Sequence, residues 1–349
     1  MRTIQIADKL VGNSEPVFVV AEVGVNHNGS VATGKKLIAA AKDAGADAVK
    51  FQTFKTDKVV TKYAAKADYQ KIGVSQNESQ YEMIKKLELG PDKIAELFDY
   101  AKKEDIIFLS SAFDRESVDL LDRLGVAAFK IASGEITNFP LLQYIAGKGK
   151  PLIMSTGAST IAEIGEALKT IRKDGAQDVI LLHCVTSYPA RKEDSNLRTI
   201  VTLKKRFKLP VGFSDHTLGI EVSIAATALG AVLIEKHFTL NRNMPGPDNR
   251  MSLQPDELKD LIAAIRNVKN ALGNGVKKLT KDERKIRDIV RRSLVARVDI
   301  PEGAIITESM LDFKRPGTGI APGRSNLVIG KRARKNIARD ELITLEKLQ

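Results

Sequence analysis

The strongest constraint on the fold of this chain is a unit that repeats over its first three-quarters: a short apolar run, a polar turn and an amphipathic helical pattern. Near-continuous apolar runs are typical of parallel strands that are covered on both faces. Eight strand–helix units over about 250 residues are typical of a (β/α)8 barrel. The eight runs lie at residues 17–24, 48–53, 106–113, 128–133, 151–157, 178–184, 210–216 and 231–239.

A doubly wound open sheet is the alternative α/β architecture. It usually carries a glycine-rich nucleotide-binding turn after its first strand. The first run here ends in Glu22-Val-Gly-Val-Asn-His-Asn-Gly29, which lacks that pattern. We therefore predict a TIM barrel, with helices that begin at capping residues such as Ser117 and Ser159–Thr160.

A charged stretch marked by glycines follows the last helical pattern and divides the chain. We expect a catalytic barrel domain over residues 1–273, a linker over 274–290 and a small domain over 291–349. In the small domain, short strand-like runs at 294–298, 304–306 and 342–345 alternate with Pro and Gly. A module of roughly 60 residues has a weak core, so we expect it to dock on another surface.

Between the second and third runs, the chain is long and polar from Phe54 to about Gln80. Loops of that length in compact domains are usually functional, often as lids. We therefore expect this segment to serve a site.

The formal charge of +12 raises the question of nucleic-acid binding. The basic residues are spread among 43 acidic ones, the densest cluster (Lys331–Lys335) is short, and tryptophan is absent. We expect no nucleic-acid partner, because a basic field or solvated lysine faces account for the charge as well. Without a signal-peptide pattern, a long apolar run or more than one cysteine, we expect a cytoplasmic protein with no membrane partner.

Polar or ionisable residues recur at the carboxyl ends of the runs, where barrel enzymes place their functional side chains. Lys50 and Lys130 each interrupt an otherwise apolar run. A buried ammonium group is costly unless it is paired, so its partner is an anionic ligand or an inward acid such as Glu22. Period-2 alternation places Gln52 on the same face as Lys50.

His216 and His237 end consecutive runs, so both could reach one point near the barrel mouth. Two imidazoles would form an open metal site suited to a Lewis-acid role, and the alternative is a structural pair. His183 and Cys184 are neighbours, which points them to opposite faces of a strand, and we interpret them as a core histidine and a buried thiol. Glu135 follows a strand end and is either a general base or an acid at a helix N-terminus.

Taken together, the motifs resemble those of the sialic acid synthase family, which includes legionaminic and pseudaminic acid synthases. Each motif is weak alone, but the set follows the family order over nearly the whole chain. The matching segments are Ala21–Gly29, Val49–Thr53, Phe129–Glu135, Ser155–Gly157, His183-Cys184, Tyr188-Pro189, Gly212–Thr217, Glu235–Thr239, Pro245–Asp248 and Lys314–Gly317.

The resemblance implies a barrel followed by an antifreeze-like (SAF, β-clip-like) domain, in a domain-swapped homodimer whose small domain caps the partner's barrel. It implies a divalent metal, Mn²⁺ first with Mg²⁺ or Co²⁺ as alternatives, on His216 and His237. Phosphoenolpyruvate is expected on Lys50, Ser111, Lys130, Ser133, Ser155 and Ser214. The amino sugar is expected near Glu22, Gln52, Tyr188 and Asp248, with Arg315 of the small domain on its N-acyl group. The residues expected to take part in catalysis are Glu135, which would manage the attacking water, Lys130 and Glu22.

The implied reaction is that of a transferase which forms a C–C bond. Phosphoenolpyruvate condenses with N-acetylmannosamine, or a closely related N-acyl amino sugar, and water to give a nonulosonic acid and phosphate with C–O cleavage. Thr186, Thr318 and Ala190–Lys192 depart from the pattern of several sialic-acid-forming members. A 2,4-diacetamido sugar, as in legionaminic or pseudaminic acid synthases, is therefore the alternative substrate.

Two further alternatives lie outside this reaction. A keto-deoxy sugar acid phosphate synthase would share phosphoenolpyruvate and metal but would need extra basic residues for a sugar phosphate. A non-enzymatic polysaccharide- or nucleic-acid-binding protein would leave the lysines and histidines at the strand ends without a purpose.

Overall fold

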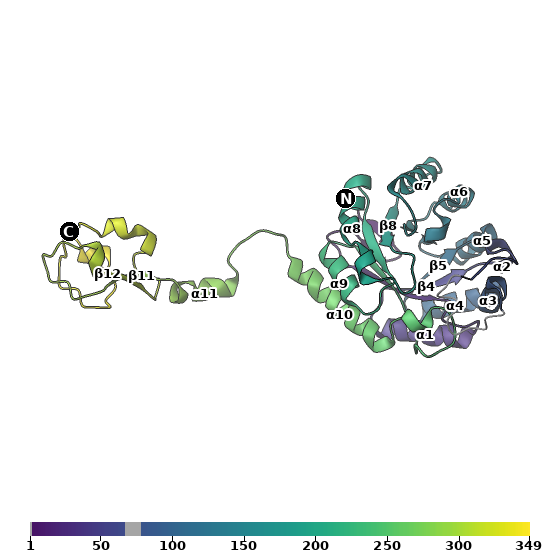
Figure 1. Ribbon diagram of the computed structural model, residues 1–349, viewed down its shortest axis with the longest axis horizontal. Coiled ribbons are helices and arrows are strands. Elements are labelled where there is room, and N and C mark those ends of the chain that lie inside the picture. Colours follow the sequence, from purple (N-terminus) through teal and green to yellow (C-terminus); the bar gives the residue numbers. More distant parts are fainter. Residues whose placement is uncertain (1, 67–77) are drawn as a thin grey trace. The chain divides into compact units, whose positions relative to one another are not determined.

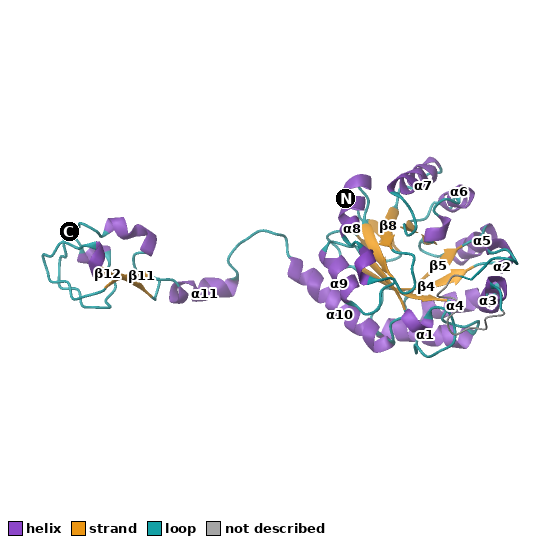
Figure 2. Ribbon diagram, viewed as in Figure 1, coloured by secondary structure: helices purple, strands orange, loops and turns teal. Residues whose placement is uncertain are grey.

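The computed structural model describes residues 2–66 and 78–349. Contacts divide the chain into two compact units, Met1–Gly273 and Asn274–Gln349 (Figure 1). In the first unit, eight parallel strands close into a barrel in the order β3-β4-β5-β6-β7-β8-β9-β10, with β10 pairing back to β3. Figure 2 shows these strands inside a ring of helices. The predicted (β/α)8 barrel is confirmed.

Every predicted run contains one barrel strand. The strands are β3 (Phe18–Gly24), β4 (Ala48–Thr53), β5 (Ile107–Ala112), β6 (Phe129–Ile131), β7 (Leu152–Ser155), β8 (Val179–Cys184), β9 (Val211–Asp215) and β10 (Leu233–His237). The helices of this unit are α1 (Val31–Asp43), α2 (Thr56–Val59), α3 (Gln80–Leu87), α4 (Pro91–Lys103), α5 (Arg115–Leu124), α6 (Phe139–Ala146), α7 (Ile161–Lys173), α8 (Arg198–Phe207), α9 (Glu221–Ala228) and α10 (Pro255–Leu272).

One of the two predicted helix caps is wrong. Thr160 caps α7 as predicted, because its side chain accepts from the backbone N–H of Glu163 in a capping box. The cap of α5, however, is Asp114 and not Ser117. The Asp114 side chain accepts the Ser117 backbone N–H at 2.8 Å, so the helix begins one turn earlier than predicted.

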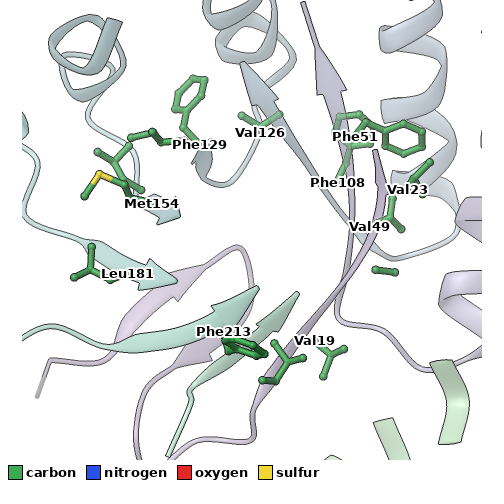
Figure 3. Close-up of a cluster of buried hydrophobic side chains, with 14 of the residues drawn as sticks. Val19, Val23, Val49, Phe51, Phe108, Val126, Phe129, Met154, Leu181 and Phe213 are labelled. Atoms are coloured by element: carbon green, nitrogen blue, oxygen red, sulfur yellow. The ribbon is translucent and has the colours of Figure 1, made fainter. Parts of the chain in front are cut away.

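The outward faces of the strands form the main core beneath the helices. Val49 and Phe51 of β4 lie on this face and pack in one cluster with Phe108 of β5. The rings of Phe51 and Phe108 stack with centroids 5.2 Å apart (Figure 3). Burial of each such side chain stabilises the fold by about 1.5–3 kcal/mol. Because side chains alternate along a strand, these outward apolar residues also determine which residues point into the barrel.

Inside the barrel, apolar residues fill the amino-terminal half. Leu109, Ile180 and Leu233 belong to this inner cluster. A short hairpin of β1 (Ile4–Ile6) and β2 (Lys9–Val11), which we did not predict, adds buried apolar side chains to the same cluster. The apolar filling leaves the polar inward residues near the carboxyl ends of the strands.

The second unit has its own small core around Leu294, Ile306 and Ile343. Strands β11 (Ser293–Ala296) and β12 (Leu311–Lys314) pair antiparallel. Of the three predicted runs only the first forms a strand. The other two contribute single bridges, Ile305 to Arg332 and Leu342 to Val295, because the Pro- and Gly-marked chain turns before a ladder can extend.

Part of the predicted linker is helical. α11 (Lys281–Val290) begins at Thr280, whose side chain and that of Glu283 form a capping box. None of its residues is buried. Charged residues dominate this helix, which explains why the composition resembled that of a linker.

The predicted lid segment is only partly described. Residues 67–77 lie outside the described residues, while α2 and α3 flank them. Across the described ranges, the longest and most apolar helices fall short of what crossing a membrane requires.

Candidate active site

Four charged side chains meet inside the barrel, one each from β3, β4, β6 and β10. Glu22, Lys50, Lys130 and Glu235 are all at most 5% exposed. The Lys50 ammonium lies 2.7 Å from Glu22 Oε2. Glu235 Oε1 lies between the two lysines, 3.7 Å from Lys50 Nζ and 3.6 Å from Lys130 Nζ. Two buried acids thus face two buried bases, as the cost of an unpaired buried charge requires.

Three serines extend this cluster. Lys130 Nζ donates to Ser155 Oγ at 2.8 Å, and Lys50 Nζ donates to Ser111 Oγ at 3.3 Å. Ser214 Oγ donates to Glu235 Oε1 at 3.0 Å. Five of the six residues predicted to bind phosphoenolpyruvate therefore belong to one buried network. We call Glu22, Lys50, Ser111, Lys130, Ser155, Ser214 and Glu235 the lysine network.

The charges in the lysine network set one another's pKa. Burial raises the pKa of Glu22 to about 7, against the opposing attraction of Lys50. Burial also acts to raise the pKa of Glu235, but Lys130 and Lys50 outweigh it, so this pKa lies below its ordinary value. Burial acts to lower the pKa of Lys50, but Glu22 and Glu235 raise it above its ordinary value. For Lys130 burial prevails, and its pKa is lowered.

The sixth predicted residue, Ser133, lies beside Cys184 and Gly157. Ser133 begins a short 3-10 turn, Ser133–Glu135, directly after β6. Its Oγ accepts the Gly157 backbone N–H at 3.0 Å and lies 3.1 Å from Cys184 Sγ. Cys184 is buried, as predicted, and points inward, while His183 points outward with Nε2 2.7 Å from the Ser195 carbonyl oxygen.

Glu135 ends the same turn and is half-buried. Asn138 Nδ2 donates to its Oε2 at 2.7 Å, and Asn138 caps helix α6. The carboxylate is thus held beside a helix start, which is one of the two settings expected from the sequence. The role of Glu135 with water remains a prediction.

His216 and His237 lie together at the barrel mouth, with ring centroids 5.5 Å apart. His216 Nδ1 donates to the Val185 carbonyl oxygen at 2.7 Å, which leaves Nε2 with its lone pair. His237 Nδ1 is buried with no hydrogen-bond partner among the described residues, and it lies 4.0 Å from Asp248 Oδ2.

Both imidazoles suit a divalent metal. Burial lowers the pKa of His216 to about 4 and that of His237 well below its ordinary value, so both rings are neutral near pH 7, as metal ligands must be. Within the described ranges, no cluster of three or more His, Cys, Asp or Glu side chains could hold a metal. Two nitrogens would leave the remaining positions to water and substrate oxygens.

A buried ion pair behind the histidines fixes their strands. Asp215, next to His216, lies with its Oδ2 2.9 Å from Nζ of Lys236, next to His237. Both side chains are at most 1% exposed, and strand alternation turns them away from the barrel interior that His216 and His237 face. Asp215 also accepts from the Thr217 backbone N–H at 2.8 Å. The pair therefore ties the ends of β9 and β10 together.

A cavity of about 180 Å³ opens beside His237. Its polar lining consists of Gln52, Tyr188, His237 and Asp248. The Tyr188 ring packs 4.2 Å from that of His216, and burial raises the pKa of Asp248 to about 6. The rest of the lining is apolar and comes largely from the start of the predicted lid segment and from α3, which follows it: Val25, Phe54, Val59, Met83, Ile84, Leu87, Phe113 and Pro247.

Comparison with known proteins identifies this arrangement. The family model described as the NeuB family matches residues 37–277, more than half of the chain. The chain belongs to the NeuB family. A SAF domain model matches residues 291–349, which confirms the predicted small domain. The sequence motifs indicated this sialic acid synthase family, whose members are enzymes that make nonulosonic acids.

Individual relatives span nearly the whole chain. An N,N'-diacetyllegionaminic acid synthase from Campylobacter jejuni is 52% identical, covering 93% of this chain and 98% of its own. One from Legionella pneumophila is 45% identical, covering 97% and 96%. A crystal structure of the N-acetylneuraminic acid (sialic acid) synthetase from Leptospira borgpetersenii, in complex with citrate, is 34% identical with a TM-score of 0.73, covering 81% of this chain and 94% of its own.

The last predicted site residue, Arg315, lies in the second unit. Its Nε donates to the Val290 carbonyl oxygen at 3.1 Å, and its side chain is exposed. The structure thus places Arg315 in the SAF domain of this NeuB-family chain.

Glu235 is the site residue that sequence reasoning missed. It sits within the segment Glu235–Thr239, where we singled out only His237. Period-2 alternation from His237 would have placed Glu235 on the same inward face. The apolar residues before Glu235 predict a buried strand but do not by themselves indicate that an acid on that strand is functional.

Proposed function

We propose that this NeuB-family chain condenses phosphoenolpyruvate with an N-acyl amino sugar and water, giving a nonulosonic acid and phosphate. The observation that carries the proposal is the lysine network beside two neutral histidines. Buried ammonium groups and serine hydroxyls suit a small, highly charged anion such as phosphoenolpyruvate. The adjoining cavity, with Gln52, Tyr188 and Asp248, suits a neutral sugar.

Lys130, Ser155 and Ser133 would bind the phosphate, and Lys50, Ser111 and Ser214 would complete the anion site. His216 and His237 would hold a divalent metal, Mn²⁺ being expected, and this ion supplies Lewis-acid polarisation of the sugar's aldehyde oxygen when bound. Asp248 lines the same cavity, with its Oδ2 4.0 Å from His237 Nδ1, and would orient a sugar hydroxyl.

In the proposed reaction, C3 of phosphoenolpyruvate attacks the aldehyde carbon of the open-chain sugar. Water then adds to C2, and phosphate leaves with the bridging oxygen as the C–O bond breaks. Lys50 and Lys130 offset the negative charge of phosphate and carboxylate throughout. Glu135 would take or relay the proton of the attacking water.

We propose a 2,4-diacetamido sugar as the substrate, which makes the product of the legionaminic acid type. The two legionaminic acid synthases share 52% and 45% of their residues with this chain, against 34% for the sialic acid synthetase. The apolar cavity wall around Met83 and Phe113 also suits a second acetamido methyl group. N-acetylmannosamine, the sugar we first expected from the sequence, carries only one.

We further propose that the chain acts as a domain-swapped homodimer, in which Arg315 completes the partner's site. Exchange of subunits between two inactive variants tests whether Arg315 acts in the partner's site. Arg315→Ala and His216→Gln homodimers, each inactive alone, should regain activity when subunits are exchanged. Continued inactivity after exchange, checked by labelled subunits, would place Arg315 in its own chain's site or outside any site.

The function is tested by phosphate release from phosphoenolpyruvate with Mn²⁺. The sugar panel comprises a 2,4-diacetamido sugar, N-acetylmannosamine and N-acetylmannosamine 6-phosphate. We expect release with the diacetamido sugar and its loss with a chelator. Phosphate release with N-acetylmannosamine but not with the diacetamido sugar would overturn the proposed substrate. No phosphate release with any sugar would overturn the proposed reaction.

A further inference from the structure

Glu235 occupies the centre of the lysine network, although the predicted substrate contacts do not include it. Its Oε1 is approached by Lys50, Lys130 and Ser214, three residues that we propose bind phosphoenolpyruvate. For Lys130, it is the one carboxylate within 4.0 Å among the described residues. One acid thus connects groups from three other strands.

The register places Glu235 on the floor of the site. His237 pairs with Glu22, whereas Glu235 lies two residues earlier on β10 and pairs with Val20 and Ser214. The next inward residue below it is Leu233, part of the apolar filling. Substrate enters from the carboxyl ends of the strands. Glu235 therefore faces the ammonium groups from below, where it can support them without occupying the space of the substrate.

We propose that Glu235 is a positioning residue that holds Lys50, Lys130 and Ser214 in place for phosphoenolpyruvate; this inference rests on the proposed function. A lysine side chain loses conformational entropy when a ligand fixes it. If the side chain is already fixed in the free protein, that loss does not occur on binding, and the ligand binds more tightly. A carboxylate that both ammonium groups approach fixes them at one point before substrate arrives.

Glu235 also favours the charged form of Lys130. Burial lowers the pKa of this lysine, and attraction to Glu235 is the largest influence that opposes the shift. Without the carboxylate, the buried ammonium would lose its nearest opposite charge and with it part of its hold on a phosphate. Positioning and charge retention predict the same result, which is weaker phosphoenolpyruvate binding.

The test uses the full chain with Glu235→Gln, which keeps size and removes charge, and Glu235→Asp, which keeps charge on a shorter side chain. Asp47→Asn is the matched control. Asp47 Oδ2 pairs with Arg266 at 2.8 Å and accepts the Val19 backbone N–H, at the opposite end of the barrel. Calorimetric titration with phosphoenolpyruvate alone gives Kd, phosphate-release kinetics give kcat and both KM values, and thermal unfolding gives stability.

We expect the Kd and KM for phosphoenolpyruvate to rise at least ten-fold in Glu235→Gln and less in Glu235→Asp, while the KM for the sugar stays near that of the wild type. Asp47→Asn should lose stability but keep the wild-type Kd. An unchanged or lower Kd in Glu235→Gln would overturn the inference, and if that variant does not fold, an unchanged Kd in Glu235→Asp would do so. If the wild-type chain neither binds phosphoenolpyruvate nor releases phosphate, the proposed function itself fails.

Discussion

Gly157 lies where a single added methyl group would press on the proposed anion site. A Cβ there would come within 2.2 Å of Thr186 Oγ1, 2.8 Å of Cys184 Sγ and 2.9 Å of Ser133 Oγ. The backbone of Gly157 is not in the left-handed region, so alanine adds no dihedral strain. The effect of Gly157→Ala therefore comes from crowding alone.

The expected size follows from which neighbour can move. Thr186 is exposed, so its hydroxyl can rotate away. Cys184 and Ser133 are held by each other and by the backbone N–H of Gly157. Overpacking of this kind costs about 1–3 kcal/mol of stability. If Ser133 binds the phosphate as we propose, its displacement would also remove that hydrogen bond to a charged group, worth about 1.5–3 kcal/mol, or roughly 10- to 150-fold in KM for phosphoenolpyruvate.

Thermal unfolding and phosphate-release kinetics measure the two effects. Each kcal/mol should lower Tm by roughly 2–4 °C in a domain of this size. Gly134→Ala is the control for stability, because a Cβ at Gly134 meets nothing within 4 Å and its φ is ordinary. The reasoning would be refuted if Gly157→Ala matched the wild type in both Tm and KM, or if Gly134→Ala lost as much stability.

Two further predictions concern the histidines. Chelation should abolish phosphate release, and added Mn²⁺ should restore it. Elemental analysis should find less bound Mn²⁺ in His216→Gln and His237→Gln. Wild-type metal content in both variants would show that these histidines do not hold the metal. Burial lowers the pKa of His27 to about 4, so below pH 6.5 the unfolded chain binds a proton that the native state does not. The free energy of unfolding should therefore fall by up to about 3 kcal/mol between pH 6.5 and 4. Urea titrations should show that the free energy of unfolding falls less between these pH values in His27→Gln than in the wild type. An identical fall would contradict the lowered pKa of His27.

The barrel could be predicted from the sequence because its strands are buried on both faces. That burial demands apolar runs such as Val179–Leu182, and each of the eight runs holds one strand. Lys50 and Lys130 stood out for the same reason, since a charge in such a run needs a partner. The small domain gave no such signal: β12 was missed and two runs proved to be single bridges. Short, half-exposed strands carry little periodicity.

The sequence could not determine which inward side chains meet. Alternation places Glu22, Lys50, Lys130 and Glu235 inside the barrel, but their partners depend on the register of strands far apart in the chain. Closure of the barrel sets β10 beside β3, which brings Glu235 within 4 Å of lysines on β4 and β6. The residue types and their inward direction follow from local burial. Only the closed tertiary structure joins them into one network, because the distances across the barrel depend on all eight strands at once.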